Sequence, residues 1–379
     1  MKKTFTILFI SIILDFIFSQ IFFLNYLEKK ELNSYKGDSI NRVYNKDYKY
    51  TFKKNSEFDA KYNNYYKIYT NDLGFRDSKV KKIDRTKEYT IVIGDSFVEG
   101  VTLLYDETIV GQLSKKVNLN FLNAGVSSYS SYIYLKKIIK IIDENPDLLI
   151  KDIIVLFDKS DMRDDLEYFN KPKYFENTKI KKANKRKNDF YKDLKELNFF
   201  RFYKKQTMSG KALDIAFGAL EDFLGNLRNM NVMAKNTNKS FFDVSYNVAK
   251  SIRSIENRKW LAQLLLDEQW EEKGKKSINF AIDNMNELNF FLKKKNINLY
   301  IVLYPWSFEI YNKELRERYL SYTTNKLREN KLLQVICYEP FLTGETYQII
   351  YENFIYSDVH YNAAGYKKLA KCIKDNIYK

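Results

Sequence analysis

A serine, a histidine and an aspartate stand at places in this sequence where they could perform nucleophilic chemistry together. Ser96 directly follows an apolar run and stands where a helix is expected to begin, which exposes its Oγ near the positive helix end. A serine attacks only after a base removes its proton, and His360 is the only histidine in the chain. Asp358 precedes it by two residues and could orient the imidazole through Nδ1. These residues predict a nucleophile, a base and an orienting acid for reactions at an acyl carbonyl.

Each of these residues taken alone also has a plainer interpretation. Serine is a preferred N-cap of helices, and a lone histidine is more often a structural or surface residue. The combination is more specific, because Ser96 ends the first expected strand and His360 comes just before the last expected helix. Both would then lie on one rim of the fold.

Alternating strand and helix patterns predict the α/β fold that would bring these residues together. Apolar runs predict strands at Thr90–Ile93, Leu119–Asn123, Ile153–Phe157, Leu299–Leu303 and, as a short fifth, Leu333–Cys337. Helical patterns are found at residues 96–116, Tyr129–Asp143, Ile278–Lys294 and Ala363–Ile377. Such alternation indicates a parallel sheet. In open parallel sheets the ligand site lies off the carboxyl ends of the strands, which is where we expect Ser96.

Four ordered motifs resemble those of the SGNH (GDSL-type) hydrolase family, in its membrane-anchored bacterial branch related to carbohydrate esterases and O-acetyltransferases. The matching segments are Leu73–Arg76, Ile91–Gly100, Leu122–Gly125 and Asp358–Asn362, and the resemblance covers roughly residues 71–165 and 280–379. It implies an α/β, three-layer, flavodoxin-like fold in which helices flank a parallel sheet. It also implies an acyl-enzyme on Ser96, with Asp358 and His360 as acid and base.

The resemblance further implies an oxyanion hole formed by the N–H groups of Ser96 and Gly125. The third block of the family normally adds an asparagine from Gly-x-Asn-Asp, and here Ser160 takes the asparagine place. Serine is a shorter donor, and losing one oxyanion donor can cost ~10²–10³ in rate. A second departure is the Asp-x-His spacing of Asp358 and His360, which replaces the commoner Asp-x-x-His.

The chain outside these motifs predicts an anchor, a tether and an insertion. Residues 1–27 are mostly apolar and long enough to cross a bilayer, and no small-x-small cleavage site follows, so we expect an uncleaved signal anchor forming a transmembrane helix. The lysines that precede the run should stay cytoplasmic, which predicts a single-pass protein of the bacterial inner membrane with a periplasmic catalytic domain. Residues 28–87 predict a tether and irregular lead-in, and residues 88–379 the SGNH hydrolase-like domain. A helical insertion at about 166–275 would serve as a lid, a substrate platform or a partner-docking surface.

The composition narrows the range of partners. The chain has 64 Lys+Arg and 48 Asp+Glu residues, a net charge of +16, but no zinc-finger, RNP or Gly-rich phosphate motif, so no nucleic acid is expected. A single histidine excludes multi-histidine zinc sites, and Asp161 and Asp164 are more typical of a solvated loop, so we assign no metal and no cofactor. Cys337 and Cys372 leave two alternatives open: a disulfide in an oxidising envelope, or two buried thiols.

The sequence therefore favours a serine-dependent ester hydrolase acting on acyl esters, with acetyl expected, of a cell-envelope glycan or lipid. An O-acetyltransferase that modifies an exported polysaccharide would use the same acyl-enzyme and pass the acyl group to a sugar hydroxyl. The alternative from another class is a catalytically reduced SGNH-like module that binds glycan or acts as a scaffold, because Ser160 replaces the usual donor. Envelope proteins are possible partners in each case.

Overall fold

The computed structural model describes residues 10–15, 17, 41–61, 65–170, 208–237, 264–265, 269–356 and 358–378. These belong to two compact units: Met1–Gly37 with Pro172–Tyr246, and Asp38–Lys171 with Asn247–Lys379. Most of the predicted anchor and tether lies outside the described residues, although residues 10–15 are helical. None of the helices described combines the length and apolar character needed to span a bilayer. All predicted site residues lie in the second unit.

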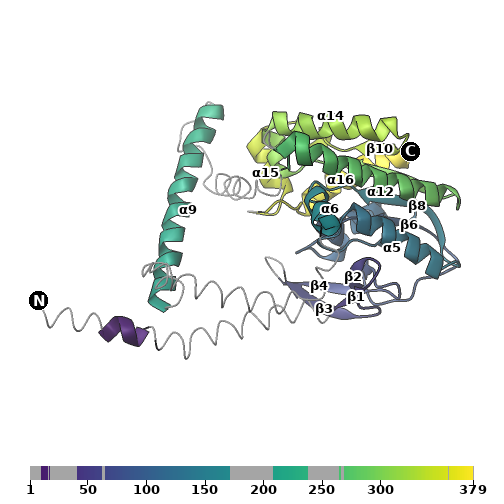
Figure 1. Ribbon diagram of the computed structural model, residues 1–379, viewed down its shortest axis with the longest axis horizontal. Coiled ribbons are helices and arrows are strands. Elements are labelled where there is room, and N and C mark those ends of the chain that lie inside the picture. Colours follow the sequence, from purple (N-terminus) through teal and green to yellow (C-terminus); the bar gives the residue numbers. More distant parts are fainter. Residues whose placement is uncertain are drawn as a thin grey trace, which may run out of the picture. The chain divides into compact units, whose positions relative to one another are not determined.

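An eight-stranded sheet with the order β10-β9-β8-β6-β7-β5-β4-β3 forms the centre of the second unit (Figure 1). Its parallel strands are β6 (Glu88–Ile93), β7 (Asn120–Asn123), β8 (Leu149–Leu156), β9 (Asn298–Leu303) and β10 (Leu333–Ile336). Ile91, Ile93 and Val155 are fully buried, as expected for central strands covered on both faces. The predicted parallel α/β arrangement is confirmed for these five strands.

The lead-in departs from the sequence expectation, because its described residues 42–61 and 65–77 contain strands and do not form an irregular segment throughout. The hairpin β1 (Arg42–Asn45) and β2 (Lys49–Phe52) forms a separate two-stranded sheet. Strands β3 (Glu57–Lys61), β4 (Tyr65–Thr70) and β5 (Arg76–Asp77) extend the main sheet in antiparallel fashion beyond β7. In β4 burial alternates along the strand, but one of its inward residues is polar and the outward ones are Tyr and Lys, which hides the period-two signal. The sheet is therefore mixed and not purely parallel.

Helices flank this sheet in two groups that pack among themselves. The first group consists of α5 (Ser131–Glu144), α6 (Asp161–Asn170), α12 (Lys275–Lys293) and α14 (Lys313–Glu329). The second group consists of α4 (Ile109–Lys116), α15 (Thr346–Asn353) and α16 (Ala363–Ile377). Shorter helical segments are α3 (Ser96–Glu99), η2 (Tyr105–Glu107), η5 (Trp270–Gly274), α13 (Ser307–Tyr311) and η6 (Glu339–Phe341).

The helix expected over residues 96–116 is divided into α3, η2 and α4. Gly100 follows α3 with φ of 74°, a left-handed conformation that ends helices and that glycine adopts without strain. Thr108 then begins α4 by accepting a hydrogen bond from the N–H of Gly111. The long helix of the first unit, α9 (Met208–Thr237), lies within the predicted insertion, which is otherwise mostly outside the described residues.

The two cysteines form a disulfide between Cys337 and Cys372. Cys337 directly follows β10, and Cys372 lies in α16. Of the two alternatives that the sequence left open, the structure contains the cross-link, which joins the edge of the sheet to the last helix.

Candidate active site

Ser96, His360 and Asp358 form a continuous hydrogen-bonded chain. Ser96 Oγ lies 2.8 Å from His360 Nε2, and His360 Nδ1 lies 2.7 Å from Asp358 Oδ1. A carboxylate only accepts hydrogen bonds, so Nδ1 donates to Asp358 and Nε2 faces Ser96 as the acceptor. Asp358 is fully buried and His360 is 5% exposed, which shields this chain from water. The geometry suits proton transfer from Ser96 to His360.

The turn after β6 holds Ser96 at the first position of α3. A Cβ on Gly94 would lie 2.4 Å from Val98 Cγ2, so the close approach of turn and helix requires glycine. Asp95 is the N-cap, and its Oδ1 accepts the N–H of Phe97 at 2.9 Å. Ser96 is therefore not the capping residue, and its hydroxyl is left to contact His360.

The segment before α16 holds the acid and the base. Asp358 Oδ1 accepts the backbone N–H groups of Val359 at 2.6 Å and of His360 at 3.2 Å, besides the imidazole Nδ1. One carboxylate thus fixes both the turn and the ring, which explains how the short Asp-x-His spacing suffices. Asn362 ends the turn by capping α16, accepting from the N–H groups of Ala364 and Gly365.

The lead-in motif stabilises the opposite end of α3. Arg76 is 1% exposed, and its Nη1 donates to the carbonyl oxygens of Glu99 at 2.5 Å and Gly100 at 2.7 Å. These carbonyls lie at the C-terminal end of the helix, where a cation is favourable. Gly74 turns the chain before Arg76 with φ of 76°. The motif that resembles the family upstream of the serine therefore supports the helix that carries it.

The three predicted oxyanion donors differ in whether they already donate a hydrogen bond within the protein. Within the described part of the chain, the backbone N–H of Ser96 has no hydrogen-bond partner. The N–H of Gly125 donates to Asn123 Oδ1 at 3.1 Å. Ser160 Oγ donates to Asp158 Oδ1 at 2.6 Å, and a hydroxyl has a single proton to donate. Ser160 thus directs its proton toward a carboxylate in this structure.

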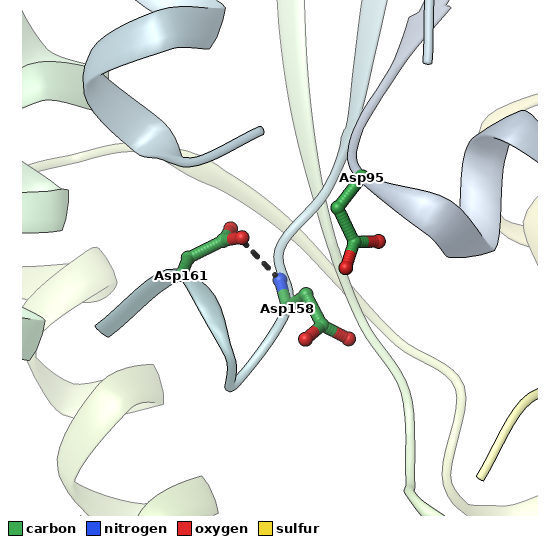
Figure 2. Close-up of side chains that lie close together, drawn as sticks. All are labelled: Asp95, Asp158 and Asp161. Atoms are coloured by element: carbon green, nitrogen blue, oxygen red, sulfur yellow. Dashed lines mark hydrogen bonds between the residues drawn. The ribbon is translucent and has the colours of Figure 1, made fainter. Parts of the chain in front are cut away.

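Three buried carboxylates, Asp95, Asp158 and Asp161, meet at this edge of the sheet (Figure 2). Carboxylate oxygens of the three lie within 4.8 Å of one another, and Asp95 Oδ2 lies 3.3 Å from Ser96 Oγ. Burial, followed by the charge of Asp158, raises the pKa of both Asp95 and Asp161 well above the usual value. Burial and mutual repulsion therefore disfavour the charged forms of Asp95 and Asp161. In the sequence only Asp161 and Asp164 stood out as an acidic pair, because Asp95 and Asp158 follow different strands, far apart in the chain.

Aromatic side chains donate to two of these carboxylates. Asp158 Oδ2 accepts from Tyr304 Oη at 2.5 Å and from Trp306 Nε1 at 2.7 Å, and Asp161 Oδ1 accepts from Tyr134 Oη at 2.9 Å. Both donors to Asp158 come from the loop after β9, which ties this loop to the segment after β8. Tyr304 follows an expected strand, but nothing in the sequence pattern indicated that it contacts Asp158.

A buried ion pair adds a second connection between the same two loops. Lys159 Nζ lies 2.9 Å from Glu309 Oε2, and both side chains are fully buried. The ammonium group also donates to the carbonyl oxygen of Tyr304 at 2.6 Å. Neither residue was singled out from the sequence, because lysines and glutamates are common in this chain and give no signal of burial.

Comparisons with known proteins give structural likenesses only. No protein-family model matches the sequence, and no curated protein matches it. Among solved structures, a member of the lipolytic protein G-D-S-L family from Veillonella parvula has 12% identity and a TM-score of 0.35, covering 77% of this chain and 99% of that one. A GDSL-like lipase from Bacteroides thetaiotaomicron has 11% identity and a TM-score of 0.34, covering 77% and 89%. An acetyl-xylooligosaccharide esterase from Geobacillus has 9% identity and a TM-score of 0.32, covering 78% and 96%.

Proposed function

We propose that this protein is a serine-dependent ester hydrolase of the SGNH type. The observation that carries the proposal is the chain of hydrogen bonds from Ser96 Oγ through His360 to Asp358. Ser96 attacks the acyl carbonyl, and His360 takes the serine proton and later returns it to the leaving alcohol. Water then attacks the acyl-enzyme, with His360 again acting as the base.

The proposed substrate is an acyl ester, with acetyl expected, of a cell-envelope glycan or lipid. The disulfide supports a location outside the cytoplasm, because such cross-links persist in oxidising compartments. In the proposed arrangement residues 1–27 anchor the chain in the inner membrane and the catalytic unit faces the periplasm, where it could also meet envelope proteins. An acyl-enzyme in this place could equally pass its acyl group to a sugar hydroxyl, so O-acyltransfer is part of the proposal.

A specific observation favours a second candidate, a glycan-binding or scaffold module with reduced catalysis. Ser160 and Gly125 direct their donors to Asp158 and Asn123. Among the predicted oxyanion donors, the N–H of Ser96 alone is then left without an acceptor in the part of the chain that the structure describes. A weak oxyanion hole would leave the fold and its binding surface intact while slowing acyl transfer.

A fluorophosphonate probe separates the two candidates, because it reacts only with an activated serine. We expect labelling of the wild-type protein and of Ser114→Ala, a matched serine change on α4, and no labelling of Ser96→Ala. Absence of labelling in the folded wild-type protein would support the binding module instead. A panel of acetyl esters, assayed with and without oligosaccharide acceptors, then measures how the acyl group divides between water and sugar.

A further inference from the structure

A buried lysine contacts the loop that would supply the second oxyanion donor. Lys137 lies in α5, is 1% exposed, and donates from Nζ to the carbonyl oxygen of Ala124 at 2.9 Å. Its Nζ also lies 3.2 Å from Tyr129 Oη. The rings of Tyr129 and Phe75 lie 4.8 and 5.0 Å from the ammonium group, a spacing at which aromatic rings attract cations. The proposed triad makes no use of this lysine.

The contact matters because of the peptide unit to which it is made. The carbonyl of Ala124 and the N–H of Gly125 belong to one planar peptide, and in a trans peptide they point in opposite directions. The other side of Ala124 is tied to β6 through its N–H, which donates to Val92 O at 2.8 Å. Gly125 itself packs against α3, since a Cβ there would lie 2.7 Å from the backbone nitrogen of Glu99. Lys137 thus holds the carbonyl end of the peptide that leads into Gly125, the residue that packs against α3.

The charge of the lysine strengthens the donor at the far end of that peptide. Hydrogen bonds in a connected chain polarise one another, and a charged donor is stronger than a neutral one. The N–H of Gly125 donates to Asn123 Oδ1, and this hydrogen bond opposes the binding of a developing oxyanion. A cation acting through the same peptide offsets this opposition.

We propose that Lys137 is a positioning residue for the oxyanion hole, fixing and polarising the Ala124–Gly125 peptide so that its N–H can bind the oxyanion. The proposal rests on the proposed function of Ser96. The titratable groups that face the ammonium group are Tyr48 from the β1–β2 turn, Tyr129 from the loop before α5, and Glu99 from α3. Burial lowers the pKa of Lys137 to about 7, and Glu99 acts in the opposite direction.

Lys137→Met tests the proposal kinetically, because methionine fills the same space and cannot donate. We expect kcat for an acetyl ester to fall about 10–100-fold, as for a weakened oxyanion donor, with KM changed by less than about twofold. The rate at which a fluorophosphonate modifies Ser96 should fall in proportion. Lys140→Met, the same change on the same helix at a lysine that pairs with Asp47, should leave both rates at the wild-type level. A folded Lys137→Met protein with wild-type kcat and labelling rate would overturn the proposal.

A second measurement needs neither turnover nor a stable Lys137 variant. Ala–Gly pairs occur only at Ala124–Gly125 and Ala364–Gly365, so ¹³C-carbonyl alanine with ¹⁵N-glycine selects these two amides in a magnetic resonance spectrum. Gly365 is a matched reference, because its N–H also donates to an asparagine Oδ1 at 3.1 Å. The measurement uses the His360→Ala protein, so that titration of the imidazole cannot shift the Gly125 amide signal.

The Gly125 amide should shift between about pH 6 and 8 as Lys137 loses its proton, while the Gly365 amide stays in place. A Gly125 amide that does not move would refute the coupling even if the variant fails to fold. A wild-type protein that reacts with neither esters nor fluorophosphonate would refute the proposed function. The amide measurement would still show whether Lys137 polarises the Ala124–Gly125 peptide.

Discussion

Ser96 and His360 are separated by 264 positions in the sequence, and their Oγ and Nε2 atoms lie 2.8 Å apart. The two residues come from opposite ends of the α/β unit, one directly after β6 and the other just before α16. Their contact therefore depends on the whole unit being folded, so loss of activity must always be compared with loss of fold.

His360→Ala should remove nearly all ester hydrolysis while leaving the fold intact. The reason is that the chain contains no other histidine to take the Ser96 proton. Asp358→Asn should cost less, because it keeps the shape of the side chain while weakening its hold on the ring. Initial rates with an acetyl ester, with circular dichroism as the fold control, measure both. Wild-type turnover in His360→Ala would contradict the mechanism.

Ser160→Ala should change kcat by less than about threefold, since its hydroxyl proton is directed to Asp158 and not to the substrate. Ser160→Asn should raise kcat on the order of tenfold by adding a longer donor that acts only in the transition state. Steady-state kinetics of the two variants gives the answer. A fall of about a hundredfold in Ser160→Ala would instead identify Ser160 as an oxyanion donor already in use.

Lys159→Met should lower the free energy of unfolding by about 3–5 kcal/mol, because it leaves the buried Glu309 carboxylate without its cation. The double variant Lys159→Met/Glu309→Leu should recover most of that loss, since no charge then remains buried at this place. Urea unfolding of the two variants and the wild type measures the difference. Equal stability of the single and double variants would show that the ion pair does not act as a unit.

Asp165 should make the stability of the fold depend on pH. Burial raises its pKa to about 6 from 3.8, although Ser131 and the backbone N–H of Tyr132 donate to the carboxylate and limit the rise. The folded state then binds more protons between these values. The contribution to stability is fully present below about pH 4 and is lost as the pH rises through 6, by at most about 3 kcal/mol.

Asp165→Asn removes the titrating carboxyl group. The quantity to compare between the wild type and this variant is the slope of the unfolding free energy with pH. We expect the unfolding free energy of the wild type to decline relative to Asp165→Asn between pH 4 and 7, as measured by urea unfolding at several pH values. Parallel curves for the two proteins would show that Asp165 has the same pKa in the folded and unfolded states.

Particular residues show what could be predicted from the sequence and what could not. The apolar runs of β6 and β8 predict central strands. Because the ligand site of a parallel sheet lies at the carboxyl ends of its strands, the end of β6 also indicates where Ser96 should lie. Strands β3 and β4 could not be recognised, because the half-exposed edge of the sheet tolerates tyrosine, lysine and threonine. Strand β5 has only two residues, both polar, and gives no strand pattern. Lys137 and Lys159 escaped notice for another reason. Among 64 basic residues, nothing in the sequence distinguishes the few that are buried.

The Cys337–Cys372 disulfide closes a loop that contains both Asp358 and His360. Closing a loop of this length commonly stabilises a fold by about 2–4 kcal/mol. The redox conditions of protein production therefore become part of any activity measurement. Protein expressed in a reducing cytoplasm, or purified with dithiothreitol, would carry its acid and base on a segment released from β10. Such a preparation would be assayed without the cross-link, whereas protein secreted to an oxidising compartment would contain it.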